Sequence, residues 1–317
     1  MITILTPTYN RAELLKSLFA SLCSQTCFDF EWLIVDDGST DDTSLVVKTF
    51  KSDKFPIRYY LKENGGKHTA LNYSHPYIKG ELLFIVDSDD ILTPDAINTI
   101  NKDWARFGQD PKMGILSYTI QCSNGELISE GDIGEYYIDN DINYRVNKNI
   151  RGDRCEIVRS DVFKKFKFPV FAGERFMGEG WLWKKIALEY NTVYFSKSIY
   201  ICEYLPGGLS KSGRLFRMNN PYGMMENCKG FMIPQVCRKV KIKEVLLFGT
   251  YGFCANLSLV EMVRKSKYHL LQLLMLPLSY CLFRYWAKKN GFKRINNTAL
   301  NYYLIVCKSI TYIKKCL

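Results

Sequence analysis

Residues 82–95, LLFIVDSDDILTPD, join an apolar run to a cluster of carboxylates and decide the fold. Five apolar residues in succession predict a strand that is buried on both faces, as in a parallel sheet. Asp87 and Asp89 follow at once, so both carboxylates are expected beyond the end of this strand, with Ser88 pointing elsewhere. Their hard oxygen ligands suit Mg²⁺ or Mn²⁺, ions that also bind diphosphate oxygens. A DxD pair alone is weak, because it occurs by chance in many chains.

Apolar strands alternate with helical patterns on the N-terminal side of this segment. The order predicts an α/β domain with a mostly parallel sheet flanked by helices, in which ligands bind beyond the carboxyl ends of the strands. The expected elements are a strand at 1–6, a helix at 11–25, a strand at 32–35, a helix after Asp41, a strand at 57–61 and a helix after Lys67.

Two further strands end in polar turns. The first strand leads into Pro7-Thr8-Tyr9-Asn10, and the second leads into Asp36-Asp37-Gly38-Ser39. Each turn alone is equally well explained as ordinary turn or helix-capping chemistry. Together with Asp87 and Asp89, these turns predict one crevice that is rich in hydrogen-bond acceptors.

The basic residues are unevenly distributed along the chain. Residues 1–234 contain 28 Lys and Arg against 30 Asp and Glu, whereas residues 235–317 contain 15 against 2. Strand and helix alternation weakens after about residue 110, helical signals return near residues 179–190, and the composition becomes helical and basic after Pro234. We therefore predict a boundary there, with one domain at 1–234 and a basic helical region at 235–317.

The basic region contains an apolar run from Leu270 to Phe283 with cationic and aromatic flanks. The run is shorter than the roughly 20 residues that span a bilayer, so we expect an element lying in the interface of an anionic membrane. A helical contact in a homo-oligomer and a merely soluble basic helix pair are the alternatives. Scattered cysteines and a first strand without a signal peptide favour the cytosol, at the cytoplasmic face of the plasma membrane.

Four segments carry a family resemblance in the right order and spacing. TPTYNR at 6–11, VDDGSTDDT at 35–43, NGGKHTALN at 64–72 and VDSDDILTPD at 86–95 are similar to the nucleotide-binding half of family 2 glycosyltransferases. The resemblance implies a GT-A fold and a bacterial polysaccharide-type hexosyltransferase, with residues 1–234 as the nucleotide-sugar-binding and catalytic domain. It also implies a nucleoside-diphosphate sugar donor, with UDP as the first choice.

The resemblance assigns roles by position. Pro7 and Tyr9 would flank the base, with Tyr9 stacked on it, and Asp37 would accept a hydrogen bond from it. Asp89 would bind Mn²⁺ or Mg²⁺, with Asp87 facing the ribose or the metal. Lys67, in a glycine-rich loop that opens a helix, would reach a phosphate or the edge of the base.

The candidate catalytic base lies in the segment FMGEGWLW at 176–183. Relatives commonly carry an acidic pair before a Trp-rich helix, but Gly180 takes one of those positions and leaves Glu179, with Glu174 in reserve. Glu179 as a helix N-terminal charge is the structural alternative. One carboxylate suffices for an inverting transfer, because it receives the acceptor proton as the oxygen attacks the sugar.

A basic loop follows this segment. Residues 204–210 and Lys211 precede Arg214 and Arg217, which would close over the diphosphate of the donor, although a solvated loop explains them equally well. We expect the acceptor to be a hydroxyl of a lipid-linked saccharide or another oligosaccharide in surface polysaccharide synthesis.

Other classes of function fit the sequence less well. A pyrophosphorylase-like nucleotidyltransferase would need a glycine- and arginine-rich loop after the first strand, and a dinucleotide oxidoreductase would need GxGxxG there. A nucleic-acid-binding protein would explain the basic region but not the carboxylate-rich strand ends. A catalytically inactive relative that binds a sugar nucleotide stays an alternative because of Gly180.

Overall fold

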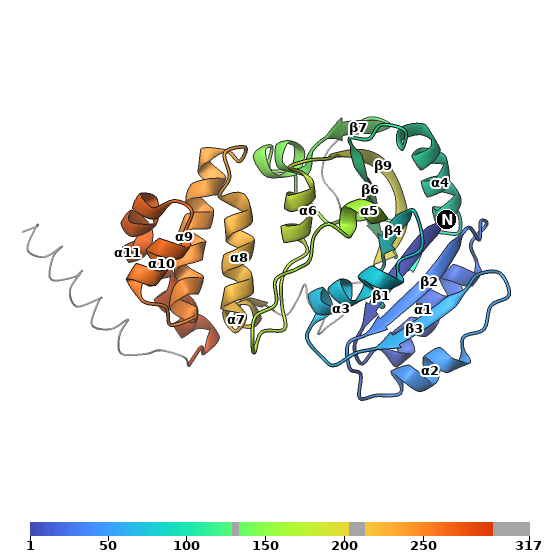
Figure 1. The fold of residues 1–317 in the computed structure, drawn as a ribbon, viewed down its shortest axis with the longest axis horizontal. Coiled ribbons are helices and arrows are strands. Elements are labelled where there is room, and N and C mark those ends of the chain that lie inside the picture. Colours follow the sequence, from blue (N-terminus) through green and yellow to red (C-terminus); the bar gives the residue numbers. More distant parts are fainter. Residues whose placement is uncertain (129–132, 203–212, 294–317) are drawn as a thin grey trace, which may run out of the picture. The chain divides into compact units, whose positions relative to one another are not determined.

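The computed structural model describes residues 1–128, 133–202 and 213–293, and the chain forms two compact units (Figure 1). The first unit comprises residues 1–169 and 182–206, and the second comprises residues 170–181 and 207–317. The first unit contains the strands β1 (Ile2–Thr8), β2 (Phe30–Asp36), β3 (Ile57–Leu61), β4 (Leu82–Ile85), β5 (Ile91–Leu92), β6 (Met113–Cys122), β7 (Tyr136–Asp139), β8 (Arg154–Arg159) and β9 (Asn191–Cys202), and the helices α1 (Ala12–Cys23), α2 (Thr43–Thr49), α3 (Lys67–Ser74), α4 (Ala96–Phe107) and α5 (Ser160–Phe163).

The described strands form one mixed sheet in the order β3-β2-β1-β4-β8-β6-β9-β5, with β7 paired to β9. Strands β3, β2, β1 and β4 run parallel, whereas β8 is antiparallel to both β4 and β6. Thr8 pairs with Asp36 and Leu5 pairs with Ile85, so three carboxyl ends lie along the same edge. The predicted mostly parallel α/β sheet is confirmed.

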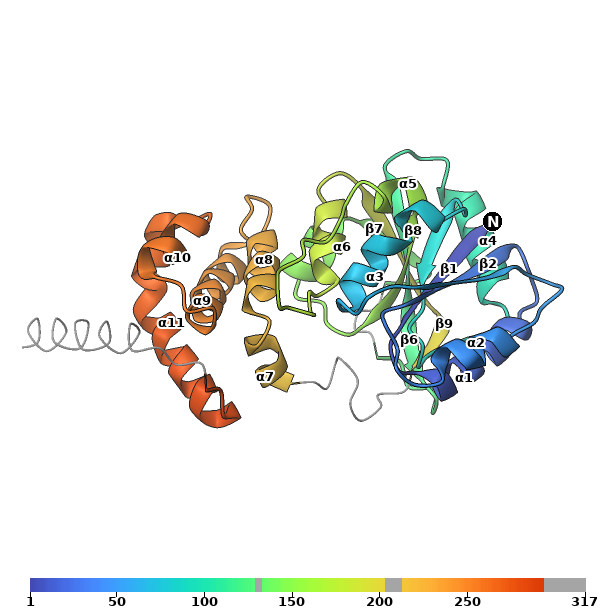
Figure 2. The same cartoon turned by 60° about the horizontal axis from the view of Figure 1, so that its bottom comes forward.

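Helices cover both faces of the sheet (Figure 2). The helices α1, α2 and α4 contribute side chains to one apolar cluster with alternate sheet residues, such as Ile4 and Trp32. Helix α1 repeats Leu15, Leu18 and Leu22 toward this core, as the 3.6-residue period requires. The opposite face carries α3 and α5.

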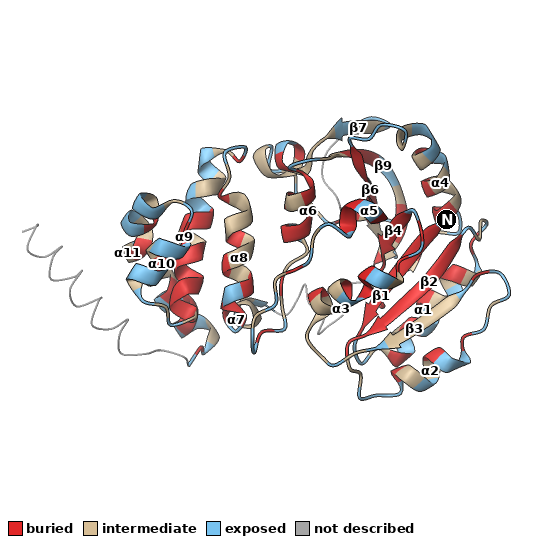
Figure 3. Cartoon of the chain, in the orientation of Figure 1, coloured by how far each residue is buried: buried red, intermediate tan, exposed pale blue. Residues whose placement is uncertain are grey.

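The central parallel strands β1, β2 and β4 are buried along their whole length, whereas the edge strand β3 is half-buried or exposed. Every residue of β1 and β2 is buried, which explains why apolar residues occur on both faces of these strands (Figure 3). Burial ends at the carboxyl edge, where the turns beyond β1 and β2 hold exposed or half-buried residues. The strands therefore act as a rigid base for polar side chains at that edge.

The second unit is helical. Its described elements are α7 (Gly213–Met218), α8 (Pro221–Phe231), α9 (Arg238–Cys254), α10 (Leu259–Lys265) and α11 (His269–Asn290), and α6 (Gly180–Ile186) begins at the division between the units. Met225 of α8, Phe248 of α9 and Phe283 of α11 share one hydrophobic cluster. The compositional boundary near Pro234 lies inside this unit, between α8 and α9.

Among the described residues, α11 is long and apolar enough to cross a membrane by length and composition alone. Its 22 residues extend the apolar run from Leu270 to Phe283 at both ends. Thirty-nine per cent of its most apolar window is buried within the protein. One side of α11 is therefore a core element of the second unit.

Candidate functional site

The turns beyond β1 and β2 are tied to each other. The Asn10 side chain accepts a hydrogen bond from the Thr40 amide at 2.8 Å, and the Asn10 amide donates to Ser39 Oγ at 2.9 Å. Asn10 has φ +52°, a left-handed conformation that asparagine adopts more readily than most residues. The preceding Tyr9 is 44% exposed beside these two linked turns.

Asp36 is buried at the end of β2 and serves the fold of the turn. It accepts hydrogen bonds from the Tyr59 hydroxyl at 2.6 Å and from the Ser39 amide at 2.8 Å. Burial and the adjacent Asp36 carboxylate raise the pKa of Tyr59, so its hydroxyl keeps the proton that it donates.

Asp37 organises the loop that leads into α3. Its carboxylate accepts from Lys62 Nζ at 2.5 Å, from the Gly65 amide at 3.0 Å and from the Gly66 amide at 2.6 Å. Gly66 has φ +93°, which a residue with a Cβ rarely adopts. A carboxylate has about four acceptor positions, and these bonds occupy most of them. The contact between Asp37 and a base stays a prediction.

The acidic cluster beyond β4 is the centre of the site. One carboxylate oxygen from each of Asp87, Asp89 and Asp90 lies within 4.8 Å of the others. Ser88 between them is buried, and it lies in a turn that follows the end of β4. Such a set of oxygen ligands fits a hard dication, so the residues present suit the metal that the sequence predicts.

Two cations border the acidic cluster. Lys67 Nζ lies 2.5 Å from Asp87 Oδ1, and Arg11 lies 4.0 Å from Asp89 Oδ2. Lys67 opens α3 directly after the loop that Asp37 holds. The structure thus brings together the predicted Lys67, Asp87 and Asp89, and it adds Arg11, which the sequence reasoning did not single out.

The sequence reasoning also did not single out Asp90 as a site residue. Burial first, and then the negative charges of Asp87 and Asp89, raise the pKa of its carboxyl to about 7, against the opposing effects of the Tyr200 hydrogen bond and Lys67. The Tyr200 hydroxyl of β9 donates to Asp90 at 2.6 Å and accepts from the Asp87 amide at 3.1 Å. In the sequence, the position of Asp90 next to the DxD pair was the one signal for its role, because its partner Tyr200 is distant along the chain.

Glu174 and Glu179 belong to the second unit. Both oxygens of Glu174 are engaged at the start of α8, where the Tyr222 and Gly223 amides donate to them at 2.8 Å each. Glu174 is 8% exposed, and its charge complements the helix dipole. Glu179 is half-buried and lies directly before α6. The assignment of the base stays a prediction for both residues.

Arg214 has partners within the second unit. Its guanidinium lies over the Trp286 ring at 4.0 Å, and it donates to the Tyr251 hydroxyl at 3.5 Å. Arg217 lies in the last turn of the same helix, α7. The predicted basic loop at 204–210 and Lys211 lie outside the described residues. A donor contact for Arg214 and Arg217 therefore stays a prediction.

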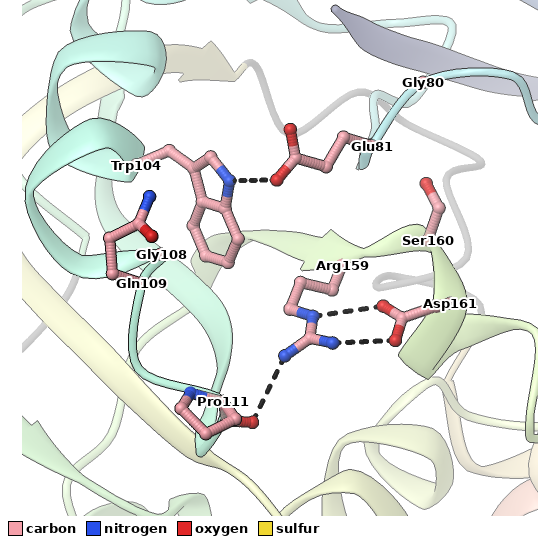
Figure 4. Close-up of a pocket in the computed structure, with 9 residues that line it drawn as sticks. All are labelled: Gly80, Glu81, Trp104, Gly108, Gln109, Pro111, Arg159, Ser160 and Asp161. Carbon is pink, nitrogen blue, oxygen red and sulfur yellow. Dashed lines mark hydrogen bonds and ion pairs between the residues drawn. The ribbon is translucent and has the colours of Figure 1, made fainter.

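A hollow of about 510 Å³ lies at the amino end of β4, away from the acidic cluster (Figure 4). Trp104 Nε1 donates to Glu81 at 2.7 Å, and Arg159 forms an ion pair with Asp161 at 2.7 Å. Because these polar groups already bind one another, the hollow is a poor match for a charged sugar nucleotide.

The sequence matches a known family over its first part. The model of Glycosyl transferase family 2 matches residues 3–125. Glycosyltransferase GlyA of Streptococcus pneumoniae is 28% identical over 219 residues, which cover 66% of this chain and 31% of that protein. Chondroitin synthase of Pasteurella multocida is 33% identical over 133 residues, or 41% of this chain and 14% of that protein. The chain thus spans about a third or less of these two relatives.

Solved structures share the fold. TarS of S. aureus, in complex with UDP-GlcNAc, has a TM-score of 0.59 at 20% identity, with coverage of 90% of this chain and 81% of that chain. The mannosyltransferase PcManGT of Pyrobaculum calidifontis, in complex with GDP-Man and Mn²⁺, has a TM-score of 0.53 at 18% identity, with coverage of 96% and 84%. The predicted GT-A fold is confirmed.

Proposed function

Residues 3–125 match the model of Glycosyl transferase family 2, and from this premise we propose that the chain transfers a sugar from a UDP-sugar to an acceptor hydroxyl with inversion at the anomeric carbon. The observation that carries the proposal is the acidic cluster of Asp87, Asp89 and Asp90 at the carboxyl end of a buried parallel strand. Ligands of open α/β sheets bind beyond such ends.

The turns beyond β1 and β2 would bind the nucleoside. The exposed Tyr9 ring offers a face on which uracil would stack, with Pro7 at its side. Asp37, held in place by the 65–66 loop, would accept a hydrogen bond from the base. TarS was solved with UDP and with UDP-GlcNAc, which supports uridine as the first choice.

The acidic cluster would hold Mn²⁺ or Mg²⁺. Asp89 and Asp87, joined by Asp90, present the oxygen ligands that these ions take, and PcManGT was solved with Mn²⁺. When bound, the ion neutralises negative charge on the departing diphosphate. Lys67 beside Asp87 would supply a further positive charge to the phosphates.

Glu179 would act as the base. As the acceptor oxygen bonds to the anomeric carbon, its proton passes to the Glu179 carboxylate, and the bond from that carbon to the diphosphate oxygen breaks. The electron pair leaves with the diphosphate, so a single displacement balances without a covalent enzyme intermediate. The product would carry a β-linkage when the donor is α-linked.

We place the acceptor at the cytoplasmic face of the plasma membrane, as a lipid-linked saccharide in surface polysaccharide synthesis. The relative named chondroitin synthase supports a polysaccharide product. The excess of basic residues in 235–317 supports a location beside anionic lipid.

A panel of labelled UDP-sugars tests the proposal. The full-length chain should hydrolyse or transfer at least one of them in the presence of Mn²⁺, and Glu179→Gln should lower that rate about a hundredfold or more, with donor affinity little changed. Binding of UDP-sugars without turnover would identify the chain as an inactive relative. An unchanged rate in Glu179→Gln would move the base elsewhere.

A further inference from the structure

Helix α11 presents an exposed apolar stripe, which we call the leucine face. It comprises Leu270, Leu273, Leu274 and Leu278. Their spacing places them on one side of the helix. Leu270 is 73% exposed and Leu274 is 64% exposed, and leucines grouped in this way mark an interaction site more often than scattered ones do.

The opposite side of α11 is packed inside the second unit. Leu276, Tyr280, Phe283 and Trp286 pack into the hydrophobic cluster with α9. Phe283 and Trp286 are therefore unavailable for membrane insertion, although their position beside cations in the sequence suggested it. The leucine face takes no part in this core, so its exposure is not explained by the packing of the helices.

Cations flank the leucine face on both sides along the chain. Arg264, Lys265 and Lys267 precede α11, and Arg284, Lys288 and Lys289 occupy its last two turns, all of them exposed. Between residues 259 and 290 the sequence has one acidic residue, Glu261, which is bound to Ser258 in a capping box. Apolar side chains next to exposed cations match the interface of a bilayer that contains anionic lipid.

We propose that the leucine face and its flanking cations dock α10 and α11 onto an anionic bilayer, with α11 lying in the headgroup interface. One side of α11 is packed on α9, so lipid can reach the other side, as in a helix that lies along the surface. A second copy of the chain fits the same face less well, because a symmetric contact would bring like charges together. The proposal stands independently of the proposed sugar transfer, since it is tested by binding alone.

Vesicle flotation of the full-length chain tests the apolar part. The chain should float with vesicles of phosphatidylcholine and phosphatidylglycerol, and L270S/L274S should lower its partition coefficient by about tenfold or more. The matched control is L45S/L188S, which replaces two exposed leucines of the first unit and should bind like the wild type. Circular dichroism and the Tm show whether each variant is folded.

A second variant tests the charges. R284Q/K288Q/K289Q should bind neutral vesicles as the wild type does and lose most of its preference for anionic ones. High salt should release the wild type only in part, because ions screen charge but leave apolar insertion intact.

Two results would overturn the proposal. Equal vesicle binding by the wild type and L270S/L274S would remove the role of the leucine face in lipid contact, whatever its effect on the Tm. A wild-type dimer that becomes monomeric in L270S/L274S, with neither protein binding vesicles, would assign the face to a second copy.

Discussion

Asp87, Asp89 and Asp90 bring three carboxyl groups to one point, where Lys67 and Arg11 offset part of their charge. The raised pKa of Asp90 reflects its burial first and the two neighbouring carboxylates second. A dication would remove that repulsion and favour the ionised form of all three groups.

Asp89→Asn removes one negative ligand from the cluster. We expect the transfer rate to fall by about a hundredfold or more, because charge on the leaving diphosphate loses its counter-ion. Wild-type activity should disappear in chelator and return with Mn²⁺ or Mg²⁺. The control is Asp53→Asn, an exposed carboxylate in the loop before β3, which should keep the full rate in the same assay. Full activity in chelator would refute the metal assignment.

The substitution Glu174→Gln should lower the stability of the folded chain. The variant loses a buried charge that accepts two amide hydrogen bonds at the start of α8, and its amide group would face one of those donors. We expect a loss of about 2 kcal/mol in the free energy of unfolding, measured by urea denaturation. Exposed Glu189→Gln is the matched control. A stable Glu174→Gln variant with strongly reduced turnover would instead make Glu174 the base.

The elements around α3 carry a pH-dependent contribution to stability. His75 follows α3 in a 3₁₀ turn, is 7% exposed and packs against Phe163 of α5. Burial lowers its pKa from 6.5 to about 4, assisted by the charges of Lys167 and Lys164. Between these values the unfolded chain binds a proton that the folded chain does not bind, so stability falls as the pH falls.

His75→Leu should flatten this dependence. Over the window from pH 6.5 to about 4, the wild type should lose up to about 3 kcal/mol through this residue, and the variant should lose less. Urea denaturation at several pH values measures the slope. Exposed His269→Gln should keep the slope of the wild type. Equal slopes for the wild type and His75→Leu would show that other groups cause the dependence.

The composition of the strands made the elements of the sheet predictable, but it did not predict the long-range contacts between them. Apolar runs identified β1, β2 and β4, and polar turns identified the edge that they share. Tyr200 reaches Asp90 from β9, 110 positions later, and no local pattern records that contact. The hydrogen bonds from the amides of α8 to Glu174, the reserve candidate for the base, are likewise not recorded in any local pattern.

At the scale of the whole molecule, charge and packing divide the chain differently. The composition changes near residue 234, but α8 shares a hydrophobic cluster with α9, so truncation after Pro234 would cut through a core. Point substitutions on the surface of α11 are the sharper test of membrane binding. The spacing of Phe283 and Trp286 with Tyr280 places all three on the buried side of α11, a periodicity that composition alone does not reveal.

Calorimetric titration of UDP into the full-length chain tests the central claim most directly, because it needs no knowledge of the sugar or the acceptor. The account predicts that UDP binds in the presence of Mn²⁺, that binding weakens by about tenfold or more in chelator, and that Asp89→Asn binds weakly in both conditions. Equal UDP affinity with Mn²⁺ and with chelator, or an Asp89→Asn variant that keeps the metal dependence of the wild type, would contradict it.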